Sequence, residues 1–401
     1  MSKTEMPSIR FYGFDNDWEQ RKFDEAFIER RNKTEKENED ILLSCAINGM
    51  FLNSELFGHF RGTTTIGYLR VKKNDLILSA QNLHLGNANV NLRFEHGIIS
   101  PAYKVYDLNN CNPEFVQSWV KRDDTKKFFL AATTEGASQC RKNIEWETLG
   151  KQTISMPSLD EQKRIGSFFS QLDNLITLHQ RKFEKLTNVK KSMLEKMFPR
   201  NGSCYPEIRF KGFTDPWEQR KLGDNIIEYT EVTTKNNQYP PLTSSRKGIF
   251  LQTEYFAGNQ IASDNNTGYN IVPYGYFTYR HMSDDEIFHF NINDIVENGI
   301  VSTLYPVFTT DESLDSRYLQ YQLNYGSEFA KFAILQKQGG SRTYIYLNKL
   351  KQLNLTMPKS VEEQKTISAF FMDLDHLITL HQRELEKLQS IKKALLEKMF
   401  V

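Results

Sequence analysis

Residues 159–198 read LDEQKRIGSFFSQLDNLITLHQRKFEKLTNVKKSMLEKMF, and residues 361–400 read VEEQKTISAFFMDLDHLITLHQRELEKLQSIKKALLEKMF. Most positions of these two segments are identical. A shorter repeat pairs IRFYGFDNDWEQRKF at residues 9–23 with IRFKGFTDPWEQRKL at residues 208–222. The repeat unit is therefore about 200 residues long, far beyond the roughly 20–50 residues of solenoid repeats.

The regions between these repeats, residues 24–153 and 224–356, have almost no similarity to each other. Both mix short β-type runs, bounded by Gly, Asn and Pro, with a helical segment at residues 113–133 or 316–336, as is typical of α+β domains. A repeated frame with two divergent domains predicts two different readers of one ligand. We expect four segments: a first divergent domain at 1–155, a first long helix at 156–200, a second divergent domain at 201–356 and a second long helix at 357–401.

Each long repeated segment begins with a helix-start signal. Ser158 precedes Glu161, and Ser360 precedes Glu363, in a Ser-x-x-Glu capping box that follows a Met-Pro pair. A helix of about 38 residues would be about 57 Å long, too long to fold into either small domain. Apolar residues recur at spacings of three and four, which predicts a coiled-coil seam between two antiparallel helices. The expected seam comprises Leu172, Leu175, His179, Leu186, Leu374, Leu377, His381 and Leu388.

Further apolar residues beside this seam widen the stripe beyond what a two-stranded coil buries. Phe169, Ile176, Phe183 and Met197 form this surplus in the first copy, and we expect the first three to bind a partner protein. The alternative is an intramolecular spacer with a wider core, because wide apolar stripes are common on globular helices.

His179 and His381 occupy equivalent positions near the midpoints of the two helices. If the helices run antiparallel, the two side chains meet. A polar layer that sets register and orientation explains such a pair, and a pH switch or a metal site is the alternative. ITLHQR contains no His, Cys or Asp cluster with metal-ligand spacing.

The order of the repeats indicates closure. IRF-GF-WEQRK follows the first long helix at Ile208, but its other copy, at Ile9, has no helix before it. If the two ends of the chain lay together, the second helix would lead into the N-terminal copy. The sequence therefore predicts a closed pseudo-two-fold arrangement that is cut open at one point.

The divergent regions are rich in the side chains that read DNA. Asn, Gln and Arg are the bidentate partners of adenine and guanine, although polar loops occur on any protein surface. Asn89 and Asn91 belong to the first such cluster. The residues that we expect to contact DNA are Gln81, Asn82, His84, Asn87, Arg93, Arg141 and Lys142 in the first domain, and Arg246, Lys247, Asn266, Tyr269, Arg280, Gln338 and Arg342 in the second.

The overall composition sets limits on function. The chain has 51 Lys and Arg against 50 Asp and Glu, a net charge of +1, so nucleic-acid binding must depend on local patches. Its four cysteines form no CxxC pair or disulfide pattern, which fits a reducing cytoplasm. No apolar run approaches about 18 residues, and the N-terminal segment lacks the apolar core of a signal peptide. We expect a soluble, cytoplasmic protein.

The sequence contains no recognisable catalytic constellation. Gly150-Lys151 lacks the earlier glycine of a P-loop, and there is no HExxH. Glu161-Gln162-Lys163 resembles the end of a nuclease motif, but it falls in the first turn of a helix, where capping explains the glutamate. We therefore expect neither a metal site nor a cofactor site on this chain.

The doubled helix start, MPSLDEQKRIGSFF at 156–169 and MPKSVEEQKTISAFF at 357–371, together with the WEQRK repeat, resembles the specificity (S) subunit of type I restriction-modification systems. The resemblance covers essentially the whole chain. It implies two target recognition domains, each reading one half of a split DNA target, and two helices that act as a spacer and as the dock for two methyltransferase (M) subunits. Restriction/translocase (R) subunits would join this complex.

The same resemblance places the chemistry on the partners. Adenine methylation, ATP hydrolysis and DNA cleavage would be reactions of the M and R subunits, which would bind S-adenosylmethionine, ATP and Mg. The main alternative is a coiled-coil adaptor that organises two protein-binding domains, and the remote one is an enzyme with an unrecognised site. Salt-sensitive binding to a specific duplex would distinguish a DNA reader from an adaptor.

Overall fold

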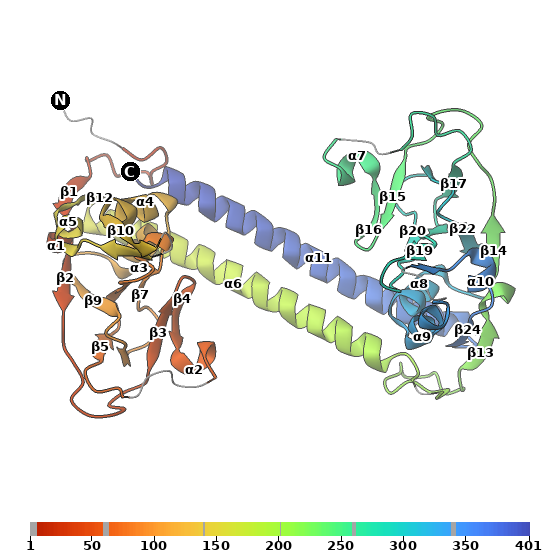
Figure 1. The fold of residues 1–401 in the computed structure, drawn as a ribbon, viewed down its shortest axis with the longest axis horizontal. Coiled ribbons are helices and arrows are strands. Elements are labelled where there is room, and N and C mark those ends of the chain that lie inside the picture. Colours follow the sequence, from red (N-terminus) through yellow and green to blue (C-terminus); the bar gives the residue numbers. More distant parts are fainter. Residues whose placement is uncertain (1–5, 59–63, 139–140, 201, 259–261, 338–341) are drawn as a thin grey trace. The chain divides into compact units, whose positions relative to one another are not determined.

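The computed structural model describes residues 6–58, 64–138, 141–200, 202–258, 262–337 and 342–401. The chain divides into two compact units, which we describe separately. Unit 1 comprises Met1–Lys182 and His381–Val401, and unit 2 comprises Phe183–Leu380. The two long helices, α6 (Leu159–Lys196) and α11 (Val361–Lys398), each contribute residues to both units (Figure 1).

The predicted starts of both long helices are confirmed. The backbone N–H of Glu161 donates to Ser158 Oγ at 3.4 Å, and that of Glu363 donates to Ser360 Oγ at the same distance. Each helix is 38 residues long, so a single hydroxyl cap at the N-terminus begins more than ten helical turns.

Capping alone does not explain the two glutamates, because their carboxylates bind arginines of the shorter repeat. Arg10 donates from Nε and Nη2 to Glu161 at 2.6 and 2.8 Å, and the Glu161 side chain is only 1% exposed. Arg209 binds Glu363 in the same bidentate manner at 2.7 and 2.8 Å, and Trp217 Nε1 donates to this carboxylate at 3.1 Å. The two repeats therefore form one joint, in which each buried carboxylate is paired.

The long helices pack antiparallel within each unit. In unit 1, Asp173 of α6 forms an ion pair with Lys392 of α11. In unit 2, the equivalent ion pair has its lysine on α6 and its aspartate on α11, and Lys190 lies 2.5 Å from Asp375. The same interaction made in both directions is the signature of a two-fold repeat.

The predicted meeting of the two histidines is confirmed. His179 Nδ1 lies 3.1 Å from His381 Nδ1 within unit 1, with the ring centroids 5.1 Å apart. Burial lowers the pKa of His381, and the nearby charges of His179 and Lys182 lower it further. A neutral pair satisfies itself, because one ring donates its Nδ1–H to the other ring's lone pair.

The predicted seam is correct at Leu172 and Leu374, which are buried, and at Leu186 and Leu388, which pack against the cores of units 2 and 1. It is wrong at two positions. The exposed fraction of the residue is 47% for Leu175 and 40% for Leu377, so both face solvent.

The residues expected to bind a partner lie in the seam instead. Phe169 is fully buried, Ile176 packs against the unit 1 core, and Phe183 is half-buried. These positions follow one another at intervals of seven. Because Phe169 follows Phe168 and Ile176 follows Leu175, the sequence allows two choices for the second seam position of each heptad, and the structure uses the later residue while Leu172 stays in the seam.

Unit 1 contains a four-stranded antiparallel sheet of order β2-β9-β6-β7 and four two-stranded ribbons, β1-β12, β3-β4, β5-β8 and β10-β11 (Figure 1). Its strands are β1 (Glu19–Lys22), β2 (Phe27–Arg30), β3 (Leu43–Ala46), β4 (Gly49–Leu52), β5 (Leu69–Lys72), β6 (Leu76–Ser79), β7 (Ala88–Val90), β8 (His96–Ile99), β9 (Tyr103–Leu108), β10 (Thr133–Ser138), β11 (Arg141–Ile144) and β12 (Thr153–Met156). Its shorter helices are α1 (Phe23–Ala26), α2 (Asn53–Leu56), α3 (Pro113–Val120), α4 (Asp123–Ala131), α5 (Trp146–Lys151) and the 3₁₀ turn η1 (Leu83–Leu85).

Unit 2 has the corresponding sheet, of order β14-β22-β18-β20, and the ribbons β13-β24, β15-β16, β17-β21 and β19-β23. Its strands are β13 (Glu218–Lys221), β14 (Ile226–Tyr229), β15 (Leu242–Ser245), β16 (Gly248–Leu251), β17 (Asn270–Pro273), β18 (Phe277–Thr278), β19 (Met282–Ser283), β20 (Asn291–Ile292), β21 (Asn298–Val301), β22 (Val307–Thr310), β23 (Thr343–Tyr344) and β24 (Asn354–Met357). Its helices are η2 (Leu222–Asp224), α7 (Gln252–Tyr255), α8 (Ser316–Tyr325), α9 (Ser327–Leu335) and α10 (Leu347–Leu350). The mixed α/β class expected for both domains is confirmed.

The helical segment of each domain is divided into two helices rather than one. In unit 1 the chain leaves α3 at Lys121 and restarts after Arg122, whose backbone is extended. In unit 2 the extended residue Gly326 separates α8 from α9. Asn112 and Asp315 cap the first helix of each pair through their side-chain oxygens.

Each divergent domain starts and ends on one ribbon. β1 pairs with β12 from Glu19↔Met156 to Lys22↔Thr153, and β13 pairs with β24 in the corresponding register. The first strand of each ribbon is the EQRK of the shorter repeat. We call β1-β12 and β13-β24 the closing ribbons, because the divergent domain leaves and rejoins the frame there.

The closure predicted from the order of the repeats is present. The N–H of Ile208 donates to the carbonyl of Lys196, at the end of α6, at 2.9 Å. The N–H of Ile9 donates to the carbonyl of Lys398, at the end of α11, also at 2.9 Å.

In the described part of the chain, no helix is both long enough and apolar enough to cross a membrane.

Candidate nucleic-acid interface

The two recognition domains share a buried hydrogen-bond frame despite their unlike sequences. Asn89 Nδ2 donates to the carbonyl of Ala46 at 2.7 Å, and Asn291 Nδ2 donates to that of Ser245 at 2.8 Å. Both asparagines lie on the last strand of the central sheet, and each contacts the end of a hairpin strand. A single frame therefore holds the same hairpin against the same sheet in both domains.

This frame shows which side chains occupy equivalent positions. The residue after the bonded carbonyl is Ile47 in unit 1 and Arg246 in unit 2. Each of these asparagines also pairs with a residue on the neighbouring strand. Two residues after that partner, the chain has Ser79 in unit 1 and Arg280 in unit 2. The backbones correspond and the side chains differ, which is the requirement for two readers of different sequences.

Other predicted DNA contacts are buried inside the domains and are corrected. Asn91 is fully buried and donates to backbone carbonyls, as does its counterpart Asn293, which was not among the predicted contacts. Asn87 is buried and donates to the carbonyl of Cys45 at 3.2 Å. Asn266 is fully buried and accepts from the N–H of Asn237 at 2.7 Å. Their side-chain amides form hydrogen bonds to the backbone of neighbouring loops, because leaving a buried amide unpaired would cost free energy.

The remaining predicted residues of the first domain lie at or near the surface. Gln81 and Asn82 are exposed, immediately before η1, and His84 is half-buried in that turn. Burial lowers the pKa of His84. Arg93 is exposed and bound to Glu55 through two hydrogen bonds of 2.6 and 2.9 Å.

The two basic residues predicted at the end of the first domain lie on β11. Lys142 is half-buried, and its charge adds to the lowering of the pKa of His84. Arg141 is a strand residue whose side chain lies outside the described part of the structure.

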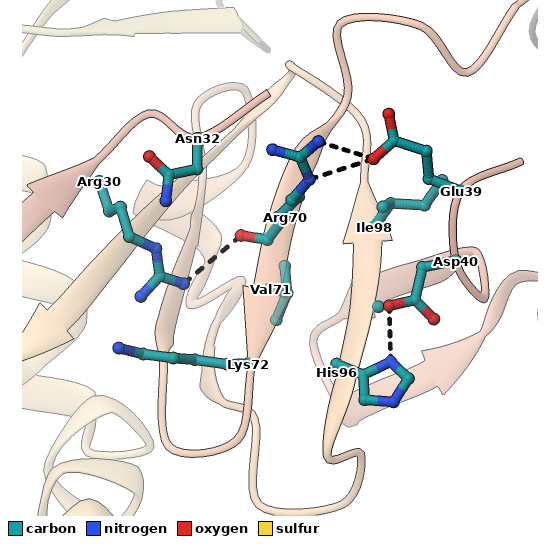
Figure 2. Close-up of a pocket in the computed structure, with 10 residues that line it drawn as sticks. Arg30, Asn32, Glu39, Asp40, Arg70, Val71, Lys72, His96 and Ile98 are labelled. Atoms are coloured by element: carbon teal, nitrogen blue, oxygen red, sulfur yellow. Dashed lines mark hydrogen bonds and ion pairs between the residues drawn. The ribbon is translucent and has the colours of Figure 1, made fainter. Parts of the chain in front are cut away.

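An open cavity of about 420 Å³ in unit 1 was not predicted from the sequence (Figure 2). Arg70 binds Glu39 through Nε at 3.1 Å and Nη2 at 2.7 Å. His96 Nδ1 lies 2.5 Å from Asp40 Oδ2. The two carboxylates, Glu39 and Asp40, lie on one loop, whereas Arg70 lies on β5 and His96 on β8. Spacing along the sequence therefore did not reveal the cluster.

Three predicted arginines of the second domain form one group. A cavity of about 220 Å³ is lined by Arg246, Arg280 and Asp284, among others. Arg246 Nη2 donates to Asp285 Oδ1 at 2.5 Å, and this hydrogen bond raises the pKa of Arg246. Arg342 Nε donates to Asp284 Oδ1 at 2.8 Å, which likewise raises the pKa of Arg342. We call these three arginines and two aspartates the arginine cluster.

The other predicted residues of the second domain are dispersed. Lys247 is exposed at the turn of the β15-β16 hairpin. The Tyr269 hydroxyl lies 3.0 Å from Ser263 Oγ. Gln338 lies outside the described residues.

The arginine cluster is neither a phosphate site nor a metal site by composition. It presents guanidinium donors beside carboxylate acceptors, whereas phosphate groups offer acceptors only. The major-groove edge of a base pair offers both kinds of group. Within the described ranges, no set of three or more His, Cys, Asp or Glu side chains is placed to hold a metal ion.

A family model described as "Type I restriction modification DNA specificity domain" matches residues 2–188 and 214–390. The chain belongs to this family. The type I specificity domain is thus present twice, and each match runs through a recognition domain into the long helix that follows it.

Two relatives of this specificity-domain chain come from Methanocaldococcus jannaschii. The first, provisionally named the type I restriction enzyme MjaX specificity subunit, is 24% identical over 365 residues, which cover 86% of this chain and 77% of the relative. The second, the type I restriction enzyme MjaVIII specificity subunit, is 23% identical over 355 residues, covering 81% and 78%.

The fold is also similar to a solved structure, that of the type I restriction-modification S subunit from M. genitalium. The TM-score is 0.60, with 12% sequence identity and 99% of both chains covered. The fold is two mixed α/β domains joined by two long antiparallel helices.

Proposed function

We propose that this chain is the DNA-recognition subunit of a type I restriction-modification complex and reads a split target with one domain per half-site. The observation that carries this proposal is the common frame with unlike side chains, Ile47 against Arg246 and Ser79 against Arg280. In this proposal the recognition domains are residues 1–155 and 201–356, and the helical segments at 156–200 and 357–401 fix their spacing.

The exposed leucines of the long helices are the proposed dock for two M subunits. Leu175 and Leu178 are 47% and 46% exposed, and their repeats Leu377 and Leu380 are 40% and 44% exposed. The two copies of LITL thus offer the same apolar surface twice. Two equal surfaces fit two copies of one partner, and these leucines replace the buried Phe169 in that role.

The chemistry of the complex belongs to the partners in this proposal. M and R subunits would carry adenine methylation, ATP hydrolysis and cleavage, and would bind S-adenosylmethionine, ATP and Mg. The near-zero net charge of this chain favours weak DNA binding alone, with M subunits supplying much of the phosphate contact.

The decisive experiment combines the chain with the M subunits of its own system and maps methylated adenines. A single split motif, together with duplex binding that weakens steeply with salt, supports a DNA reader. Assembly with M subunits but without sequence preference would instead indicate the adaptor.

A further inference from the structure

Arg280 is held in a rigid position at the rim of the unit 2 cavity. The preceding residue, Tyr279, is fully buried and donates its hydroxyl to the carbonyl of Ile345 at 2.9 Å. The following residue, His281, is buried, bonded through Nδ1 to the carbonyl of Leu304 at 2.6 Å. The backbone of Arg280 is therefore anchored on both sides, while its side chain is exposed.

Arg280 is also the member of the arginine cluster that is free to bind. Arg246 and Arg342 each donate to an aspartate, whereas the Arg280 guanidinium forms no hydrogen bond or ion pair with any residue in the described part of the chain. A guanidinium that is positioned but unpaired keeps its donor fork for a ligand, and little conformational freedom of its backbone is lost on binding.

The two aspartates determine which part of DNA fits. Three arginines and two aspartates leave a net charge of only +1, and carboxylates beside a phosphate would repel it. A G·C pair presents O6 and N7 of guanine as acceptors beside the N4 amine of cytosine as a donor. The free Arg280 fork suits the guanine, and Asp284, which accepts from Arg342 through one oxygen, suits the cytosine amine.

We propose that Arg280 reads the major-groove edge of a guanine in the half-site recognised by the second domain. This inference rests on the proposed function. The first domain has Ser79 at the equivalent position, so the contact belongs to one half-site only. Its loss leaves the other half-site unchanged.

The test uses the full chain with its M subunits, in wild type and with Arg280→Lys, Arg280→Ala or Lys331→Ala. Arg280→Lys keeps the charge but loses the bidentate fork. Lys331 is the matched control, an exposed cation on α9 of the same unit. Methylated adenines are mapped, and duplex affinity is measured with guanine or 7-deazaguanine, which lacks the N7 acceptor, at each G·C position.

Both Arg280 variants should accept other bases at one former G·C position of one half-site, where wild type discriminates about 10- to 100-fold. Wild type should bind a duplex with 7-deazaguanine at that position more weakly than the duplex with guanine. Arg280→Ala should bind these two duplexes with equal affinity. Lys331→Ala should keep the motif. An unchanged motif in Arg280→Ala would overturn the inference. A normal motif in Arg280→Lys, with binding weakened only in Arg280→Ala, would also overturn it, because this result would indicate a phosphate contact. A wild type without any split motif would instead overturn the proposed function.

Discussion

The backbone N–H of Ile9 donates to the carbonyl of Lys398 at 2.9 Å, in the same manner as Ile208 donates to Lys196. In the second case the two residues are close neighbours along the chain. In the first they are separated by almost the whole sequence. The joint between a long helix and the WEQRK repeat is thus formed twice with the same hydrogen bond, once between residues close in sequence and once between the two ends of the chain.

This equivalence predicts that residues 1–200 form a dimer. In the full chain, Phe400 packs against Phe115 and Phe169, with centroids 5.2 and 5.9 Å apart. Phe198 is the repeat of Phe400, so in the fragment it should occupy that place on a second copy. Pairing becomes bimolecular, and sedimentation should show a dimer whose population rises with concentration and with M subunits.

The fragment with M subunits should specify a palindromic split target made from the first half-site. Phe198→Ala is the matched control, expected to weaken the dimer while keeping the recognition domain folded. A fragment that stays monomeric even with M subunits, or that methylates a non-palindromic site, would falsify the symmetric account.

Target choice should be modular, because each divergent domain is attached through a closing ribbon. Replacing residues 24–153 with the equivalent domain of a relative should change one half of the target and leave the other half unchanged. Methylation mapping is the measurement. The reciprocal replacement of residues 224–356 is the control, and maps in which both halves change together would contradict two independent readers.

The exposed leucines should bind M subunits. Leu175→Glu with Leu377→Glu should abolish co-purification with M subunits and leave a folded chain, because both side chains already face solvent. Asn174→Glu adds the same charge beside Leu175 and should retain binding. Phe169→Glu should instead unfold unit 1, since it buries a charge, and retention of M subunits by the double leucine variant would exclude this dock.

The joint between the repeats should be a sensitive point for stability. Arg10→Ala leaves the buried carboxylate of Glu161 unpaired and should lower the free energy of unfolding by about 3–5 kcal/mol. Arg209→Ala should cost less, because Trp217 Nε1 still donates to Glu363. Urea unfolding followed by circular dichroism measures both effects.

The control for this prediction is an exposed pair. Arg31 is 72% exposed and bound to Glu29, so Arg31→Ala should change stability far less than Arg10→Ala does, because an exposed ion pair contributes little. Equal losses for Arg10→Ala and Arg31→Ala would show that the joint contributes no more than a surface ion pair.

The histidine layer should make stability depend on pH. Burial and the charges of His179 and Lys182 lower the pKa of His381 below its unfolded value of about 6.5. Just below pH 6.5 the unfolded chain therefore binds more protons, so the free energy of unfolding should fall as pH falls through this window.

His381→Asn should flatten this dependence between pH 6.5 and 5 while keeping a polar group in the layer. His376→Asn, at an exposed position of the same helix, is the control for the loss of one histidine. Melting temperatures that fall equally with pH in wild type and in His381→Asn would count against a role for the layer.

The repeats made the frame predictable. A signal that occurs twice, such as Ser158 with Glu161 and Ser360 with Glu363, is hard to explain by chance, and the antiparallel meeting of His179 and His381 followed from it. The seam register was not predictable in the same way. Adjacent apolar residues at 168–169 and 175–176 offer two choices for the second seam position of each heptad, and only the packed partners distinguish them.

The recognition surface was less predictable than the frame. Asn87 and Asn89 have the same chemistry as an asparagine that reads adenine, but tertiary contacts use them inside the domain. One signal was available, since Asn89-x-Asn91 recurs as Asn291-x-Asn293 between otherwise unlike regions. A motif kept by both divergent domains belongs to what they share, and specificity resides in what they do not share.

The contact of Phe400 with Phe115 also affects the order in which the two units are completed during synthesis. Leu396, Met399 and Phe400 complete the core of unit 1, yet a ribosome synthesises them only after all of unit 2. Unit 2 draws its equivalent residues, Met197 and Phe198, from chain made before its own domain begins. Two halves that are equivalent in the finished fold are therefore unequal during synthesis: unit 1, although begun first, is completed last and exposes this apolar surface until then.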